Sequence, residues 1–218
     1  MSELAEVTVA DTVRWLHDEG LARLAGVGAD APGPIVAYTV EVATGMVTVF
    51  PAEVIGPGTD VVSVPADDLP AATGTPKRLV VVGVTVTDAV LVLDLAAVRS
   101  LGVFATRPEF VIRAWIMQLL LDPDLIITTN SDALAVEAGT RLRHTFIPGG
   151  GTLVTIDDKQ PPVTTITLNP ATEGPERLEV AADRSAELYL GTRFWQLHRV
   201  LGIDELTWAD LVARLETN

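Results

Sequence analysis

The chain has 218 residues, of which 48% are hydrophobic and 20% are charged, so its composition is typical of a folded protein. Its 15 basic residues stand against 29 acidic ones, and the net charge of −14 argues against a nucleic-acid partner, because neutralising phosphates requires clustered lysine and arginine. The lack of cysteine excludes disulfides, thiolate zinc sites and cysteine nucleophiles.

The sequence carries no signal that directs it to a membrane. Residues 1–11 lack the basic start and apolar core of a signal peptide. The most apolar stretch, Phe110–Leu121, is shorter than the about 20 apolar residues that cross a bilayer. We therefore expect a cytoplasmic protein without membrane insertion.

The N-terminal part predicts a helix and a β-hairpin. Thr8 and Asp11 have the spacing of a capping box, in which a hydroxyl and a carboxylate three residues on satisfy free amides. The predicted elements are a helix or helix pair from Thr8 with a break near Gly20, a linker over 26–34, and strands at Ile35–Val42 and Met46–Phe50. A loop-rich segment over 65–76 predicts two domains, 1–70 and 71–218, with one continuous domain as the alternative.

The remainder alternates strand and helix patterns. The predicted strands are 79–86, 89–95, 101–105, 125–128, 142–147, 152–156 and 163–168, and the predicted helices are 107–121, a short one ending at Gly139, 186–201 and 208–215. Strand–helix–strand order favours parallel strands with crossover helices. The expected fold is therefore α/β: a mixed sheet with a parallel strand–helix–strand core, an N-terminal helix and hairpin, and C-terminal helices.

Residues 78–142 resemble a known pattern. A hairpin ending in Leu91–Leu95 is followed by Leu101–Ala105, a helix that carries Arg113-Ala114-Trp115, and the strand Leu125–Thr128. This order is similar to the nucleotide-binding core of the DNA-translocase and type VII secretion ATPase superfamily. It is closer to the degenerate, RecA-like P-loop domains of some actinobacterial regulatory and secretion-associated proteins.

The same segment departs from an active ATPase. An active member carries G-x-x-x-x-G-K-[ST] between strand and helix, whereas this loop is Ala105-Thr106-Arg107-Pro108-Glu109, without glycine or lysine. Pro108 lacks an amide donor and Glu109 adds negative charge where phosphate would lie. The strand that would end in magnesium-binding acids ends in Thr128-Thr129-Asn130. The resemblance therefore implies a domain that has lost nucleotide hydrolysis.

Few residues are candidates for a site. Thr106 and Arg107 could hold an anion at the start of a helix, although a solvated arginine is the simpler interpretation. His17, His144 and His198 lack the spacing of metal ligands, and no nucleophile motif accompanies His144. The final helix has an apolar stripe that could pack in the core or dock on a partner, formed by Trp208, Leu211, Val212 and Leu215.

These observations favour a protein that is not an enzyme. The first hypothesis is a protein–protein interaction module, namely an adaptor, chaperone or regulatory subunit, whose mean hydropathy of +0.36 favours an oligomer or a protein complex. The second is an acidic immunity or antitoxin-type inhibitor of a basic partner. The third is a nucleotide- or anion-binding domain. We expect no cofactor, no metal and no catalytic residue.

Overall fold

The computed structural model describes residues 7–31, 33–52, 61–72, 78–136, 141–146, 151–159 and 163–216. The chain divides into two compact units, Met1–Ala97 and Val98–Asn218. This division lies after the second hairpin rather than at residue 70, because β5 (Ala89–Asp94) pairs antiparallel with β1 (Ile35–Glu41) and so belongs to the first unit.

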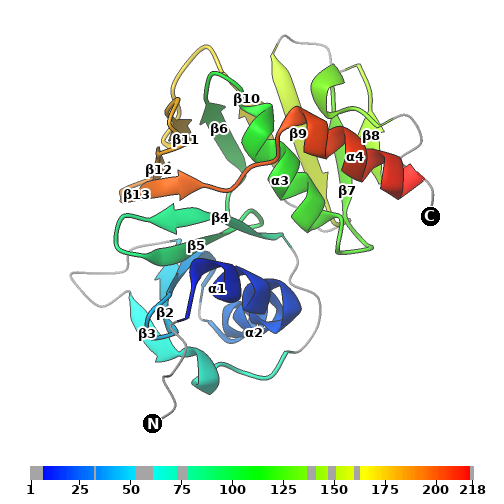
Figure 1. The fold of residues 1–218 in the computed structure, drawn as a ribbon. Helices are drawn as coiled ribbons and strands as arrows, with labels where there is room; N and C mark the ends of the chain where they lie inside the picture. The colour runs from blue at the N-terminus through cyan, green and yellow to red at the C-terminus, as the bar shows by residue number, and fades with distance from the viewer. Residues whose placement is uncertain are drawn as a thin grey trace. The chain divides into compact units, whose positions relative to one another are not determined.

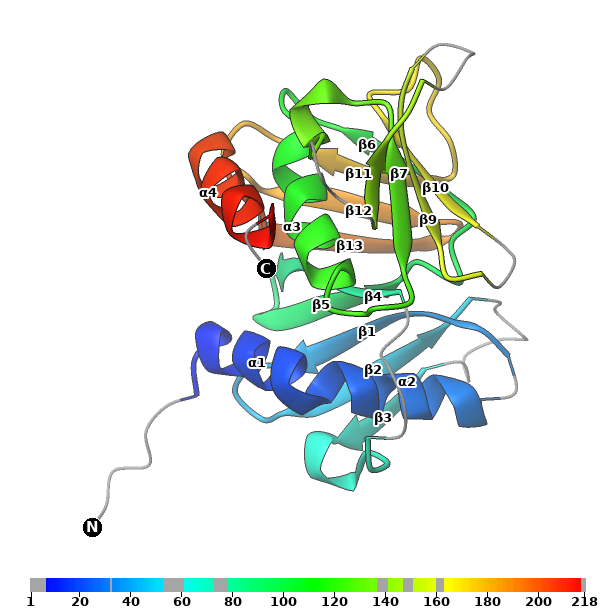
Figure 2. The same ribbon diagram turned by 90° about the vertical axis from the view of Figure 1, so that its right-hand side faces the viewer.

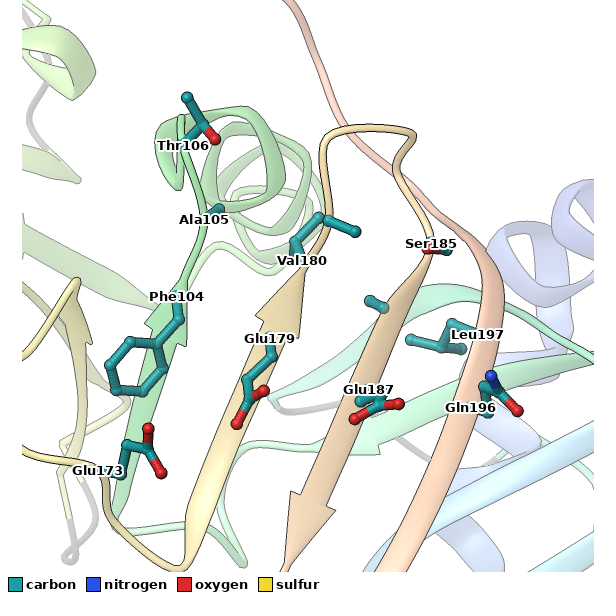
Figure 3. Close-up of a pocket in the computed structure, with 12 residues that line it drawn as sticks. Phe104, Ala105, Thr106, Glu173, Glu179, Val180, Ser185, Glu187, Gln196 and Leu197 are labelled. Carbon is teal, nitrogen blue, oxygen red and sulfur yellow. The ribbon is translucent and has the colours of Figure 1, made fainter.

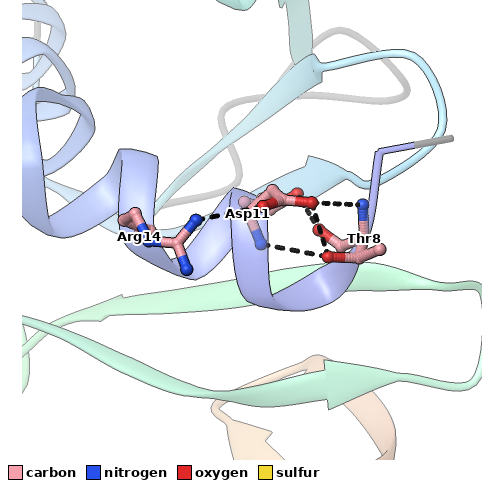
Figure 4. A network of polar contacts seen from close by, with 4 residues as sticks. Thr8, Asp11 and Arg14 are labelled. Carbon is pink, nitrogen blue, oxygen red and sulfur yellow. Dashed lines mark hydrogen bonds and ion pairs between the residues drawn. The ribbon is translucent and has the colours of Figure 1, made fainter. Parts of the chain in front are cut away.

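The first unit begins with three consecutive helical segments, α1 (Val9–Trp15), a π-helical turn (Leu16–Gly20) and α2 (Leu21–Asp30). The predicted capping box is present: the Asp11 amide donates to Thr8 Oγ1 (3.2 Å), and the Thr8 amide donates to Asp11 Oδ2 (3.1 Å; Figure 4). The predicted linker over 26–34 is wrong in its first half, since α2 continues to residue 30. Burial of Leu21 and Leu24 on the same helix outweighs the low helix propensity of its glycines.

The first unit also contains an antiparallel sheet that the helices cover on one face (Figures 1 and 2). Its strands are β1, β2 (Met46–Pro51), β3 (Val62–Pro65), β4 (Leu79–Thr85) and β5, in the order β3-β2-β1-β5-β4. The two predicted hairpins are confirmed, whereas the short strand β3 was not predicted. The Tyr38 hydroxyl donates to the Leu24 carbonyl (3.1 Å) and connects β1 to α2.

The second unit has a mixed sheet of eight strands with the order β13-β12-β11-β6-β10-β9-β7-β8. Its elements are β6 (Ser100–Phe104), α3 (Glu109–Leu119), β7 (Ile126–Thr129), β8 (Leu142–His144), β9 (Thr152–Asp157), β10 (Thr164–Leu168), β11 (Glu176–Val180), β12 (Ala186–Leu190), β13 (Arg193–Val200) and α4 (Glu205–Glu216). Figures 1 and 2 both show α4 beside α3. The mixed α/β class is therefore confirmed.

The expected parallel core is present only in part. β6 pairs parallel with β10, β10 pairs antiparallel with β9, and β9 pairs antiparallel with β7, so β6 and β7 point the same way. However, the β9–β10 hairpin lies between them. α3 thus connects β6 to β7, two strands that run in the same direction but are not neighbours in the sheet. The order of strands and helices along the chain does not show that another hairpin is inserted between them.

The helix predicted over 186–201 is wrong. The segment forms the hairpin β12–β13, which turns at Gly191 with a φ of 60°. Burial alternates along β12, and Trp195 and Leu197 are buried on β13, as expected for a strand with one covered face. One C-terminal helix, α4, remains from the predicted pair.

The short helix predicted to end at Gly139 is replaced by a 3₁₀ turn, Asp132–Leu134. Gly139 itself, the end of the predicted strand at Ile147, and two of the three glycines at 149–151 lie outside the described residues. A second 3₁₀ turn, Ala66–Asp68, follows β3 in the first unit.

Candidate functional site

The segment between β6 and α3, where Thr106 and Arg107 lie, borders a pocket in the second unit. Asn169, just after β10, fixes the end of β6: its Oδ1 accepts from the Ala105 amide and its Nδ2 donates to the Ala105 carbonyl, both at 3.0 Å. Pro108 then starts the turn that leads into α3. The Asn169 side chain thus bonds both backbone groups of Ala105 and fixes the point where the loop between β6 and α3 begins.

The pocket has a volume of about 520 Å³ and lies between β6, α3, the β11–β12 turn and the start of α4. Its charged lining residues are Arg107, Glu109, Arg113, Arg184, Asp204 and Glu205. Three guanidinium groups thus face three carboxylates, so the lining is formally neutral. Its apolar surface comes mainly from alanine, valine and phenylalanine side chains. We call this the α3 pocket.

The start of α3 does not offer a phosphate cradle. The Phe110 amide already donates to the Arg107 carbonyl (3.2 Å), and the Val111 and Ile112 amides donate to the Pro108 carbonyl (3.2 and 3.3 Å). A P-loop leaves several such amides free for phosphate oxygens. Three amides in the first turn of α3 are therefore already satisfied and are not free for a polyphosphate.

Arg113 is the most unusual side chain in the α3 pocket. It is 7% exposed and lies on α3 one turn beyond Glu109. Its Nη2 donates to the Ala133 carbonyl (3.0 Å), whereas its Nε is buried without an acceptor. Among the residues that the structure describes, no carboxylate forms an ion pair with it. A buried charge normally has such a partner, because desolvation is otherwise costly.

Arg184 and Asp204 form the opposite wall of the α3 pocket. The Arg184 guanidinium lies 4.7 Å from the centroid of the Phe110 ring, a cation–π distance. Asp204 caps α4, since its Oδ1 accepts from the Thr207 amide at 2.8 Å. Hydrogen bonds from Thr207, and then the charge of Arg184, lower the pKa of Asp204. Both charges on this wall are thus already engaged.

A second feature of the unit is one face of the sheet formed by β6, β11, β12 and β13. It is the face opposite to the one on which Leu178 and Leu188 are buried. Figure 3 shows part of it, with Glu179 and Glu187 on adjacent strands. We call it the outer face and define it by Phe104, Arg177, Glu179, Glu187, Tyr189 and Phe194.

Aromatic and charged groups of the outer face contact one another. The Arg177 guanidinium lies 3.8 Å from the centroid of the Tyr189 ring, and the Tyr189 and Phe194 centroids are 5.0 Å apart. Arg177 also pairs with Glu179 (2.5 Å), and the Tyr189 hydroxyl donates to Glu187 (2.6 Å), which raises the pKa of Tyr189. Phe194 is still 51% exposed. The side chains are therefore mutually ordered yet accessible.

A shallow pocket of about 500 Å³ lies where these strands end, and Glu173, Glu179 and Glu187 line it (Figure 3). Thr106 borders both this pocket and the α3 pocket, whereas Arg107 borders the α3 pocket. Both side chains are exposed. The pair predicted from the sequence thus lies at the pocket rim, and neither residue forms its buried wall.

The predicted stripe on α4 faces inward at its start. Trp208 is buried, and Leu211 and Val212 are half-buried. The side chain of Leu215 lies outside the described part of the chain. The burial of Trp208 fits packing in the core. Docking of a partner on Leu211, Val212 and Leu215 stays a prediction.

The histidines are dispersed. His144 Nε2 lies 3.2 Å from Asp132 Oδ1, and no hydroxyl among the described residues forms a hydrogen bond with it. His198 is exposed on β13, within the segment that was predicted to be a helix. Within the described ranges, no three His, Asp or Glu side chains are grouped as metal ligands, and no helix is long and apolar enough to span a membrane.

Comparison with protein-family models, with curated proteins and with solved structures found no match for this chain. The resemblance to degenerate P-loop domains therefore stays a prediction.

Sequence reasoning missed Arg113, Arg184 and Asp204 as members of one site. Arg113 had a signal, because it is the one charged residue in the apolar stretch Phe110–Leu121. Arg184 and Asp204 had none, since they reach the pocket only through the pairing of β11, β12 and β13.

Proposed function

We propose that the protein is a non-catalytic protein–protein interaction module of the cytoplasm, an adaptor or regulatory subunit. The observation that carries this proposal is the outer face, where Arg177, Tyr189 and Phe194 form an exposed, mutually packed cluster. Tyrosine, phenylalanine and arginine are enriched at protein interfaces, where a rigid aromatic side chain buries much area at little entropic cost.

The loop between β6 and α3 supports the non-catalytic part of this proposal. Its strand–loop–helix order agrees with the P-loop resemblance, but the amides of Phe110, Val111 and Ile112, in the first turn of α3, already donate to the Arg107 and Pro108 carbonyls. Such a loop suits a domain that descends from a nucleotide-binding fold and serves as a scaffold. The degenerate P-loop origin is part of the proposal.

The test places a photo-crosslinkable phenylalanine analogue at position 194 in the full chain, in cells. We expect it to crosslink to one defined protein, either a second copy of this chain or a different one. The matched control is the same analogue at Leu206, which is 85% exposed on α4 and outside the outer face. Excess wild-type protein should compete for the crosslink, whereas Phe194→Ser should compete poorly.

Three outcomes would contradict the proposal. The first is no crosslink from position 194, and the second is the same products from positions 194 and 206. The third is turnover of a substrate, or a thermal shift with ATP and magnesium that resembles specific ligand binding.

A second candidate function, an acidic inhibitor of a basic partner, is supported by the net charge of −14 and by Glu173, Glu179 and Glu187 around one pocket. The two candidates differ in salt dependence. Recognition through the aromatic cluster should change by less than about threefold when salt rises from about 0.05 to about 0.5 M, whereas charge-driven inhibition should weaken steeply. Titration of the crosslinked partner at both salt concentrations distinguishes them.

A further inference from the structure

The α3 pocket contains a buried cation whose charge no described side chain balances. Arg113 is 7% exposed, its one hydrogen bond within the described part of the chain goes to the neutral Ala133 carbonyl, and its Nε is without an acceptor. Buried guanidinium groups are usually paired with carboxylates, often through two parallel hydrogen bonds. Arg113 is one of the residues that line a pocket large enough for a small molecule, since ligand pockets measure about 300–1,000 Å³.

The surrounding charges restrict the ligand to a single negative charge. Arg184 is stacked on Phe110 and acts on Asp204, so this pair is already matched. Glu109 and Glu205 also line the pocket, and they would repel a polyphosphate.

The uncharged residues that line the α3 pocket determine the chemical character of the rest of the ligand. Ala105, Phe110, Ala133 and Val180 contribute an apolar surface beside the guanidinium. An anion with an apolar body would therefore bury carbon against these side chains while its charged end meets Arg113. Inorganic phosphate has no such body and would gain less.

We propose that the α3 pocket binds a small organic monocarboxylate, whose carboxylate group pairs with Arg113 while its apolar part lies against Phe110. Arg107, exposed at the rim, supplies a second positive charge at the entrance. This site is distinct from the outer face, so it goes beyond the interaction function and can fail or succeed independently of it.

The experiment uses the full chain and sodium benzoate as the probe, with benzyl alcohol as its uncharged match. We expect benzoate to bind at millimolar concentration by titration calorimetry and to shift the Arg113 Nε–H signal in a ¹H–¹⁵N spectrum. Benzyl alcohol, inorganic phosphate and ATP should each bind at least about tenfold more weakly. Equal binding of benzyl alcohol, or tighter binding of phosphate or ATP, would overturn the proposal, as would no benzoate binding at all.

Variants then locate the site. Arg113→Gln should weaken benzoate binding about tenfold or more, because it removes the paired charge. Glu109→Gln should tighten benzoate binding about two- to fivefold, because it removes a like charge at the pocket without touching a buried group. Arg14→Gln, at an exposed residue of α1, is the matched control and should leave binding unchanged.

If Arg113→Gln does not fold, Glu109→Gln and Arg107→Gln decide the matter. Tighter binding in the first and weaker binding in the second support the proposal. Unchanged benzoate affinity in either variant, or unchanged affinity in a folded Arg113→Gln, places the probe elsewhere and overturns it.

Discussion

A single glycine shows how closely the second unit is packed around the α3 pocket. A Cβ built on Gly202 would lie 1.9 Å from Phe110 Cε1, and the next residue, Ile203, donates its amide to the Phe110 carbonyl (2.8 Å). We expect Gly202→Ala to lower the free energy of unfolding by about 1–3 kcal/mol, because the Phe110 ring must shift. Chemical denaturation measures this change, and Gly174→Ala, where the added Cβ meets its nearest atom at 3.9 Å, is the control. Equal losses in both variants would contradict the packing argument.

The Thr8–Asp11 capping box predicts a pH effect at the same scale. Hydrogen bonds from Thr8, and then the charge of Arg14, lower the pKa of Asp11 (Figure 4). A carboxylate whose pKa is lower in the folded state stabilises the fold above its unfolded pKa and loses that contribution as pH falls through the folded pKa. Asp11→Asn should therefore unfold at lower denaturant than wild type at neutral pH, and the two should converge in acid.

The control for this experiment is Asp210→Asn, since Asp210 lies within α4 and pairs with Arg214 rather than capping a helix. Denaturant midpoints measured across the acidic range give the comparison. A constant difference between Asp11→Asn and wild type at all pH values would show that the charge of Asp11 does not contribute.

At the scale of elements, α4 tests whether its apolar stripe belongs to the core. Trp208 is 5% exposed, whereas Leu206, on the same helix, is 85% exposed. Trp208→Ala should cost about 3–5 kcal/mol of unfolding free energy, while Leu206→Ala should change it by less than about 0.5 kcal/mol. Thermal and chemical unfolding of the two variants measure the contrast. Similar stabilities would mean that α4 is not anchored by Trp208, and docking of this stripe on a partner would then gain support.

The elements also show what sequence patterns can and cannot predict. The hairpin β1–β2, the helix α3 and the strand β6 follow from runs of apolar residues, so they were predicted within a few residues. The hairpin over 186–201 was not predicted, because its apolar residues at 194, 197 and 201 also fit a helix. The pairing of β12 with β13 decides in favour of strands. Likewise the α3 pocket joins β6 to residues about 100 positions later, a contact that exists only once β11, β12 and β13 are paired.

For the whole molecule, net charge opposes self-association through the exposed apolar residues. The charge is −14 at pH 7 and vanishes near the sequence isoelectric point of 4.5. Protonation of carboxylates removes mutual repulsion as the pH falls, while the exposed part of Phe194 stays available for contact. We therefore expect the mass measured by light scattering to rise as the pH is lowered from 7 to 4.5.

Phe194→Ser should reduce this rise more than Leu206→Ser does, and circular dichroism on the same samples verifies that each protein is folded. An equal rise in both variants would mean that the outer face is not the self-association surface, whereas an unchanged mass would mean that charge does not control association.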